Sequence, residues 1–364
     1  MKKKINALIY APAPPQPPGG IGSLVAMLYY EWVQRTDVCF VSPQVKETGW
    51  VAKIIRPLFN LVKLAFVTKQ VNKGGRVLFF SSAGNSFFEK LAWSLLVILM
   101  GRKPSLVMVD GNFPHFHENL PNSLKWLSLL AVKNIDTLAV QSPQWKIFYE
   151  KTFPHTHVRI VSPGIDTNFF VPRSTSSISR ESIEIIYVGW LTEDKGIYDL
   201  LDAAQIVAQN GFLFQLRLIG PDFGNKNKIN AYVERLGLES KIKITGAVTS
   251  RETLRETYQS ADIFVFPSHF EGFPYALMEA ISSGLPCIAT RVGGIPDILD
   301  DGFCGLLVEK GSRIELAESL TTLISDKPYR TKLGDLARKR AVSEYSLLKS
   351  LNDFKTVLNI TNEG

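Results

Sequence analysis

The sequence contains only three cysteines, Cys39, Cys287 and Cys304, among its 364 residues. They are too few and too widely spaced for a disulfide framework or for the paired ligands of a structural zinc site. We therefore expect three reduced thiols in a cytoplasmic protein, and no metal among its functional residues.

A long uninterrupted apolar run is also missing. The longest, about Leu91–Met100, is well short of the roughly 20 residues that span a bilayer as a helix. The segment MKKKINALIYAP carries basic residues but only a short apolar run before its prolines, so it is predicted to be a first strand and not a signal peptide. Low-complexity tracts and repeats are absent, which indicates a globular chain.

Acidic residues are scarce in the first half of the chain. Residues 1–172 hold 19 Lys and Arg against 9 Asp and Glu, whereas the remaining residues hold 22 against 25. This asymmetry predicts an anionic partner for the N-terminal half, such as membrane lipid, nucleic acid or a phosphorylated substrate. The sequence shows no zinc-finger spacing or RNA-recognition signature, so we expect no nucleic acid.

Short apolar runs bounded by turn residues alternate with helical patterns almost throughout, which is typical of buried parallel strands in an α/β protein. A polar, Ser-rich linker lies around Pro172–Ser182 and separates two such series. The pattern predicts two doubly wound, Rossmann-like domains with parallel sheets, residues 1–172 and 173–344, which face a cleft.

The predicted strands of the first domain are Ile5–Tyr10, Val38–Val41, Arg76–Phe80, Ser105–Val109, Thr137–Val140 and Val158–Val161. Those of the second are Glu184–Gly189, Phe214–Ile219, Lys241–Thr245, Ile263–Pro267, Pro286–Thr290 and Leu306–Val308. Predicted helices include Gly22–Gln34, Leu120–Lys133, one that begins at Ser142-Pro143, and Glu344–Ile360.

A glycine-rich loop, PPGGIGSLVAML, follows the first predicted strand and opens a helix. Its glycines allow close approach of a ligand, and the amides at a helix start favour an anion. Val25 stands where a dinucleotide fingerprint has its third glycine, so a nicotinamide or flavin site is disfavoured. The loop is equally consistent with a tight turn.

Two stretches of the second half carry candidate ligand-binding residues. In VGWLTEDKG, Lys195 follows a strand and would neutralise phosphate as a point charge. In HFEGFPYALMEA, Glu271 precedes a predicted helix, and Pro274 suits the first position of that helix. Glu279 lies inside the same helix, more than one turn after its start. The carboxylates could accept hydrogen bonds from sugar hydroxyls, or could simply satisfy backbone amides and water.

These motifs, taken together, resemble the retaining glycosyltransferase family 4, the glycosyl transferases group 1 with the GT-B fold. In the second half the resemblance rests on VGWLTEDKG, GAV and SADIFVFPSHFEGFPYALMEAISSGLPCIATRVGGIPDIL. In the first half it rests on GGIGSLVAML and VSPGIDTNFFVP. It implies that the C-terminal domain binds a nucleotide-sugar, that the N-terminal domain binds the acceptor, and that residues 345–364 pack back on the N-terminal domain.

The resemblance also implies roles for single residues. Glu271 would contact the donor sugar, Glu279 the ribose hydroxyls and Lys195 the diphosphate, while Gly20 and Ile21 would approach the diphosphate from the other domain. The remaining donor-binding candidates are Ala247, Val248, Gly272, Phe273, Pro274 and Tyr275.

The sequence departs from the family pattern at two places. Trp190 stands where many relatives have an arginine on the diphosphate, so Arg217, Arg291 or an N-terminal lysine would have to replace that cation. The expected histidine after the fourth strand is replaced by VMVDGNFPHFH. Asp110, His115 and His117 are the candidates there, and with Glu271 we take Asp110 and His115 as the candidate catalytic residues.

The resemblance implies transfer, with retention, of a hexose-type sugar from a UDP- or GDP-sugar to a saccharide or lipid-linked saccharide, in cell-surface polysaccharide or glycolipid synthesis. No cofactor or metal is expected, since the D-x-D device is missing. Alternatives are a nucleotide-sugar epimerase or hydrolase of the same fold, and a non-catalytic nucleotide-sugar-binding protein.

A basic and apolar segment, TGWVAKIIRPLFNLVKLAFVTKQVNK, suggests peripheral association with the inner face of the cytoplasmic membrane. It contains Lys53, Arg56, Lys63, Lys69 and Lys73. An ordinary helix pair packed on the sheet is an equally good interpretation, because Pro57 is expected to break one long helix.

Overall fold

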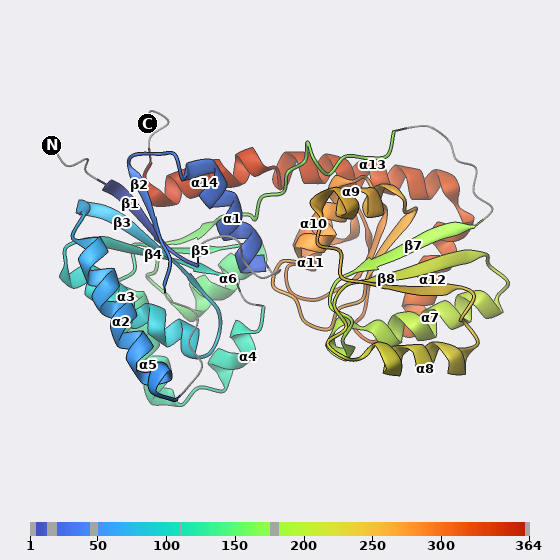
Figure 1. Cartoon of the computed structure of the whole chain (residues 1–364), viewed down its shortest axis with the longest axis horizontal. Helices are drawn as coiled ribbons and strands as arrows, with labels where there is room; N and C mark the ends of the chain where they lie inside the picture. The colour runs from blue at the N-terminus through green and yellow to red at the C-terminus, as the bar shows by residue number, and fades with distance from the viewer. Residues whose placement is uncertain (1–4, 13–19, 44–49, 110, 175–181, 361–364) are drawn as a thin grey trace. The chain divides into compact units, whose positions relative to one another are not determined.

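A computed structural model describes residues 5–12, 20–43, 50–109, 111–174 and 182–360, with backbone alone for residues 20, 21, 23 and 50–58. The chain divides into two compact units, and each is described by itself (Figure 1). Unit 1 comprises Met1–Gly164 and Leu347–Gly364, and unit 2 comprises Ile165–Ser346.

Unit 1 is built on a six-stranded parallel sheet in the order β2-β1-β3-β4-β5-β6. Its strands are β1 (Ile5–Tyr10), β2 (Val38–Val41), β3 (Val71–Ser81), β4 (Lys103–Met108), β5 (Thr137–Val140) and β6 (Val158–Ile160). Its helices are α1 (Gly20–Trp32), α2 (Trp50–Thr68), α3 (Asn85–Leu99), α4 (Phe113–Glu118), α5 (Asn122–Val132), α6 (Pro143–Thr152) and the C-terminal α14 (Leu347–Leu358).

Unit 2 has a second six-stranded parallel sheet, in the order β12-β11-β10-β7-β8-β9. Its strands are β7 (Ile183–Val188), β8 (Phe214–Ile219), β9 (Ile242–Gly246), β10 (Ile263–Phe266), β11 (Cys287–Thr290) and β12 (Leu306–Val308). Its α-helices are α7 (Ile197–Gln209), α8 (Lys226–Leu236), α9 (Arg251–Gln259), α10 (Tyr275–Ser282), α11 (Ile295–Ile298), α12 (Arg313–Ser325) and α13 (Lys327–Glu344), and its 3-10 turns are η1 (Glu193–Lys195) and η2 (Asp300–Gly302).

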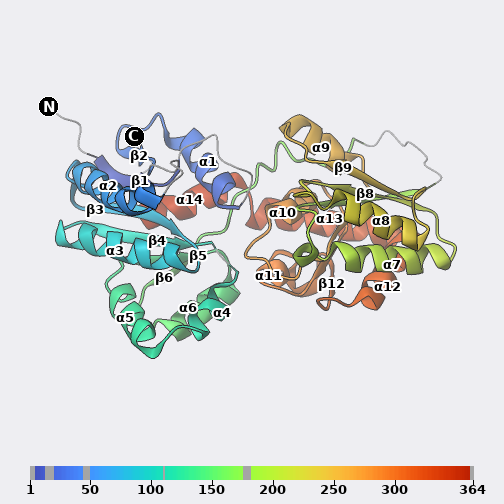
Figure 2. The same cartoon turned by 60° about the horizontal axis from the view of Figure 1, so that its bottom comes forward.

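The strand order of unit 2 reverses between β7 and β10. From β7 the chain winds outward through β8 and β9, and from β10 it winds the other way through β11 and β12. Because parallel crossovers are right-handed, α7 and α8 lie on one face, with α12, while α9, α10 and α13 lie on the other (Figures 1 and 2). Ligands bind in such sheets beyond the carboxyl ends of the strands at this switch point.

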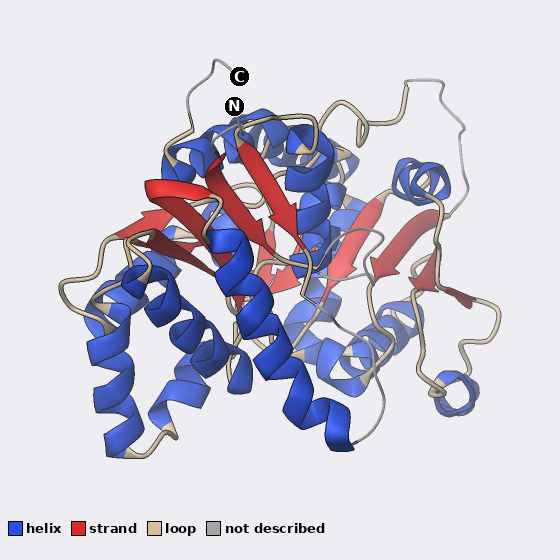
Figure 3. Ribbon diagram, turned by 60° about the vertical axis from the view of Figure 1, so that its left-hand side comes forward, coloured by secondary structure: helices blue, strands red, loops and turns tan. Residues whose placement is uncertain are grey.

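The prediction of two doubly wound, Rossmann-like units is confirmed, and Figure 3 shows strands flanked by helices in each. Central strands are buried on both faces, because consecutive residues such as Leu106 and Val107 of β4 are both fully buried, which explains why these strands read as apolar runs. The predicted helix start at Ser142 is also confirmed, since its Oγ accepts a hydrogen bond from the Trp145 amide at 3.4 Å.

The boundaries between the two units lie at residues 164/165 and 346/347. The sequence had predicted them at 172/173 and 344/345. Ile165 and Phe170 belong to the core of unit 2, and the Ile165 amide donates to the carbonyl of Tyr345 at 2.8 Å. The last helix, α14, packs within unit 1, where Arg76 donates to the carbonyl of Val357 at 2.6 Å.

Two helix predictions need correction. The backbone of α2 runs unbroken from Trp50 to Thr68, so Pro57 does not end the helix, although a proline there removes one backbone hydrogen bond. The final predicted helix, Glu344–Ile360, is divided, because α13 ends at Glu344 and α14 begins at Leu347. Among the described residues, no helix is both long and apolar enough to cross a membrane.

Candidate functional site

An ion pair joins the loops that follow β7 and β10, the two strands at the switch point of unit 2. The Lys195 ammonium lies 2.7 Å from Oε1 of Glu271, and it donates to the carbonyl of Phe270 at 3.2 Å. Both side chains are mostly buried, with 17% and 13% of their surfaces exposed. An ammonium group has three donors, and the described residues accept from two of them, so one N–H of Lys195 remains for a ligand.

The loop that carries Glu271 is fixed by neighbouring loops. Ser268 donates through its hydroxyl to Oε1 of Glu271 at 2.8 Å, and Thr290 donates to the carbonyl of Ser268. The His269 ring nitrogen lies 2.6 Å from Oδ2 of Asp199. These contacts hold the carboxylate in one orientation before any ligand arrives, which is what a binding site requires.

Glycine is needed where Gly293 passes the Glu271 loop. Gly293 has a φ of +53°, and a Cβ placed on it would lie 1.8 Å from the carbonyl oxygen of Glu271. The next amide, of Gly294, donates to the carbonyl of Gly272 at 2.9 Å. Gly293 and Gly294, in the motif TRVGGIPDIL, therefore support the loop of Glu271.

Replacing Gly293 with alanine is expected to displace the Glu271 loop. The positive φ alone costs an alanine about 1–3 kcal/mol, and the overlap with the Glu271 carbonyl adds to it. Gly311→Ala is the matched control, because Gly311 has a φ of +77° and open space around its Cβ position. A melting temperature that falls more for Gly293→Ala than for Gly311→Ala would agree, and equal falls would contradict the close approach.

The second acid, Glu279, lies on α10 against a tyrosine of α9. The Tyr258 hydroxyl donates to Oε2 of Glu279 at 2.8 Å. Burial raises the pKa of Glu279 to about 7, although the hydrogen bond from Tyr258 and the charge of Arg251 oppose this rise. The neighbouring Tyr275 hydroxyl is buried without a hydrogen-bond partner in the described part of the chain, so this region has polar groups available to a ligand.

We expect Glu279→Gln to change the pH dependence of stability. The pKa of Glu279 rises from its ordinary 4.5 to about 7 on folding, so the folded state holds this proton more tightly. Its contribution to the free energy of unfolding therefore falls as pH rises between these two values. Relative to the wild type, the melting temperature of Glu279→Gln should rise from about pH 5 to about pH 8. Glu239→Gln, at an exposed acid, is the control, and a difference that is constant with pH would contradict the prediction.

The remaining predicted donor residues of unit 2 lie on the same edge of the sheet. Gly272 and Phe273 follow Glu271. The Phe273 side chain is buried, and its ring centre lies 5.5 Å from that of Tyr345. The sequence suggested that the helix begins at Pro274. In the structure Pro274 precedes the helix in extended backbone, and α10 begins at Tyr275. Ala247 and Val248 follow β9 directly, after Gly246 with a φ of +75°.

Trp190 is half-exposed just after β7, at the position where the family pattern has an arginine. Its ring meets that of Phe223 edge to face at 5.3 Å, and its carbonyl accepts a hydrogen bond from the Tyr187 hydroxyl at 2.8 Å. Arg217 does not replace the missing cation, because it pairs with Glu184 and Ser260 near the amino ends of β7 and β10. Arg291 follows β11 and pairs with Asp301.

Unit 1 holds the other predicted residues. Gly20 and Ile21 are the first residues of α1, and only their backbone is described. Asp110 also lies outside the described residues. His115 is exposed on α4, whereas His117 packs between Phe113 and Phe153, and burial lowers its pKa. His117 therefore belongs largely to an aromatic cluster of unit 1.

Sequence reasoning missed Ser268, Tyr258, His269 and Asp199, which orient the two acids. Tyr258 is 21 residues from Glu279, and Asp199 is 70 residues from His269. No local pattern links residues so far apart, although Ser268, which comes three residues before Glu271, follows the strand end and could have been noted.

Comparison with known proteins places these residues in a family context. Residues 173–340 match the family described as glycosyl transferases group 1. The D-inositol 3-phosphate glycosyltransferase of Corynebacterium glutamicum is 31% identical over 58% of this chain and 54% of its own length. The capsular polysaccharide biosynthesis glycosyltransferase CapM of Staphylococcus aureus is 31% identical over 46% of this chain and 43% of its own length. The matches thus span about half the length of these curated relatives.

Solved structures resemble the whole chain. Anabaena Alr3699/HepE in complex with UDP has a TM-score of 0.76 at 16% identity, and covers 98% of this chain and 100% of its own. Sucrose-phosphate synthase from Thermosynechococcus elongatus has a TM-score of 0.74 at 17% identity, with coverage of 98% and 99%. At these identities the likeness shows the fold alone.

Proposed function

We propose that this chain, whose residues 173–340 match the glycosyl transferases group 1 family, transfers a hexose-type sugar from a nucleoside-diphosphate sugar to a saccharide or lipid-linked saccharide. The observation that carries this proposal is the Lys195–Glu271 pair at the switch point of unit 2. It combines a cation for a diphosphate with a carboxylate for sugar hydroxyls at the sheet edge where ligands bind.

In the proposed reaction, a hydroxyl oxygen of the acceptor forms a bond to the anomeric carbon as the bond from that carbon to the diphosphate oxygen breaks. The nucleoside diphosphate leaves with the electron pair, and its leaving oxygen takes the proton that the acceptor hydroxyl loses. Negative charge grows on the leaving group, and Lys195 stabilises it electrostatically. Glu271 orients the sugar, and Glu279 receives the ribose hydroxyls.

We further propose that the reaction retains the anomeric configuration and needs no metal ion. Lys195 supplies the positive charge that a metal–diphosphate contact provides in other enzymes, and UDP or GDP is the leaving group. Incubation of the full chain with UDP-, GDP- and ADP-sugars and saccharide acceptors tests the activity through release of the nucleoside diphosphate. Proton NMR of the product gives the anomeric configuration, and chelator treatment should leave the rate unchanged. Release of nucleotide without a glycosylated product would favour a hydrolase or epimerase.

A lipid-linked acceptor is favoured by apolar side chains on one face of unit 1. The helices α2, α3 and α5 lie together on that face (Figures 1 and 2). They expose Phe59, Val62, Phe66, Leu95, Leu99, Trp126, Leu127 and Leu129. Phe66 is 68% and Leu99 77% exposed, and Lys69 comes directly after the end of α2, three residues beyond Phe66. An apolar surface with a lysine beside it suits an anionic bilayer. Lys63, another lysine of the basic and apolar segment, instead donates a hydrogen bond to the carbonyl of Ser42.

The double variant Phe66→Ser/Leu99→Ser is expected to lose binding to phosphatidylglycerol-containing vesicles in a flotation assay. Each buried apolar side chain contributes about 1.5–3 kcal/mol, so the partition constant should fall more than tenfold. Ile147→Ser is the control, because Ile147 is as exposed as Phe66 but lies on α6. Equal flotation of the three proteins would contradict a membrane role for this face.

A further inference from the structure

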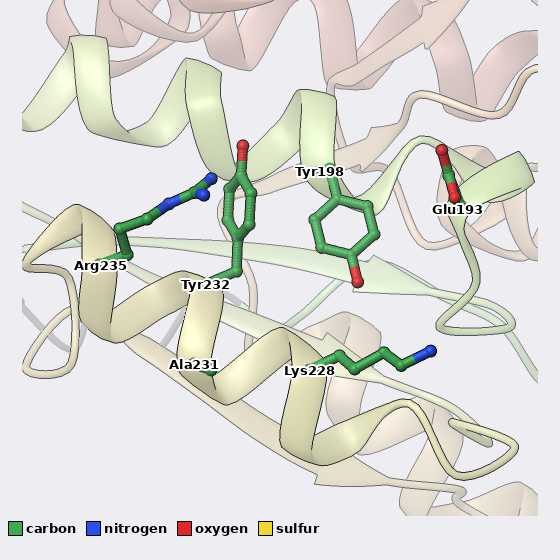
Figure 4. Close-up of a pocket in the computed structure, with 6 residues that line it drawn as sticks. All are labelled: Glu193, Tyr198, Lys228, Ala231, Tyr232 and Arg235. Atoms are coloured by element: carbon green, nitrogen blue, oxygen red, sulfur yellow. The ribbon is translucent and has the colours of Figure 1, made fainter.

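A hollow of about 660 Å³ lies between α7 and α8, on the face of the unit 2 sheet that these two helices cover (Figure 4). It is lined by Glu193, Tyr198, Lys228, Ala231, Tyr232 and Arg235. The α8 members recur at intervals of three and four residues, so they share one face of the helix, while Ile229 and Val233 are buried. The hollow is separate from the Lys195–Glu271 pair, although Glu193 and Lys195 share η1.

Two tyrosine rings form the aromatic part of the hollow, and their contacts hold them in place. The Tyr232 hydroxyl donates to Oδ1 of Asp202 at 2.7 Å, and the guanidinium carbon of Arg235 lies 4.2 Å from the Tyr232 ring centre. The rings of Tyr198 and Tyr232 are 4.9 Å apart at 62°. They therefore make a corner and not a slot between parallel faces, so a flat nucleobase could not insert between them.

The described residues do not balance the charges of the hollow. Asp202 is already bound by Tyr232 and by Arg313 at 3.3 Å. Among the described residues, no carboxylate lies within ion-pair distance of Lys228 or Arg235. Two cations thus face a single acid, Glu193, although the C-terminal half of the chain has more acidic than basic residues. The hollow favours an anion beside an aromatic corner.

We propose that this hollow is a second saccharide-binding site, which takes a uronic-acid residue of an acidic glycan. The apolar C–H face of a pyranose packs on the Tyr198 ring, and its carboxylate accepts a charge-assisted hydrogen bond from Lys228, while Arg235 lies over the Tyr232 ring at the other end of the hollow (Figure 4). Since Glu193 lies in the same short turn as Lys195, the site would hold part of an acidic chain close to the donor loop. The proposal goes beyond the transfer reaction and concerns binding alone.

Binding of the full chain to immobilised oligogalacturonate, without a nucleotide-sugar, tests this site. At about 0.15 M salt, where long-range attraction is screened, we expect Lys228→Gln and Tyr198→Leu each to weaken binding by about tenfold. Lys226→Gln is the matched control, because it removes the same charge from the same helix outside the hollow and should leave affinity almost unchanged. The methyl-esterified oligomer, which lacks the charge, should bind at least tenfold more weakly.

Equal losses in Lys228→Gln and Lys226→Gln would overturn the proposal, since they would indicate general attraction to the basic chain. Wild-type affinity in Lys228→Gln, or displacement of the oligomer by UMP, would also overturn it. Lys228 is exposed, so its replacement does not threaten folding. Lys195→Met should leave oligogalacturonate binding unchanged, which makes failure of this proposal distinguishable from failure of the donor site.

Discussion

Replacing Lys195 with methionine is expected to lower kcat/KM for glycosyl transfer by about 10²–10³-fold. Methionine keeps the length of the side chain but removes the cation that neutralises the leaving diphosphate. It also leaves the Glu271 carboxylate, now 2.7 Å from the ammonium, without its partner beside an anionic ligand. Both effects oppose the growth of negative charge in the transition state.

The control for Lys195→Met is Lys226→Met, which removes a lysine charge at the exposed start of α8. Steady-state kinetics with the active donor should show near wild-type values for this control. A Lys195→Met enzyme that retained more than a tenth of the wild-type kcat/KM would show that Lys195 does not stabilise the leaving group. Far-ultraviolet circular dichroism of each variant establishes that the loss does not reflect unfolding.

Glu271→Gln is expected to lower kcat/KM by about 10²-fold or more, because the amide accepts hydrogen bonds only through one oxygen and carries no charge. The amide can still accept the hydrogen bond that Ser268 donates at 2.8 Å, so the loop should keep its conformation. Glu309→Gln, at an exposed acid after β12, is the control. A Glu271→Gln enzyme with wild-type kinetics would remove Glu271 from the proposed sugar contacts.

The two variants should not be additive. Lys195 and Glu271 form one ion pair, so the double variant is expected to lose less activity than the product of the two single losses. The coupling measured in the double-mutant cycle reports whether the pair acts as a unit. Additive losses would indicate that the pair separates before the reaction and that each residue then acts alone.

The strands of the fold could be predicted closely because buried parallel strands appear in sequence as short apolar runs between turn residues. β1 and β8 have the predicted bounds, and β12 does as well. β3 is longer than predicted, since it begins at Val71, where polar residues and Gly74-Gly75 gave no strand pattern. The pairing of Val71 with Ile5 that extends it is a tertiary contact, which local sequence does not indicate.

The site could be predicted in its acids and its lysine, because Lys195 and Glu271 follow strand ends that become neighbours in the sheet. Their direct ion pair was not foreseen, since the sequence gives each residue a place but not the orientation of its side chain. The raised pKa of Glu279 was likewise hidden, because it depends on burial against Tyr258. A one-dimensional pattern contains no information on either contact.

The most direct measurement of the central claim is a thermal-shift series with UDP-, GDP- and ADP-sugars on the wild type and Lys195→Met. A ligand that binds only the folded state stabilises it by RT ln(1 + [L]/Kd), about 2.7 kcal/mol at a hundredfold excess over Kd. We predict that at least one nucleotide-sugar raises the melting temperature of the wild type and that Lys195→Met loses this response. If no nucleotide-sugar raises it, or if both proteins respond equally, the donor site is not formed by Lys195 and its neighbours.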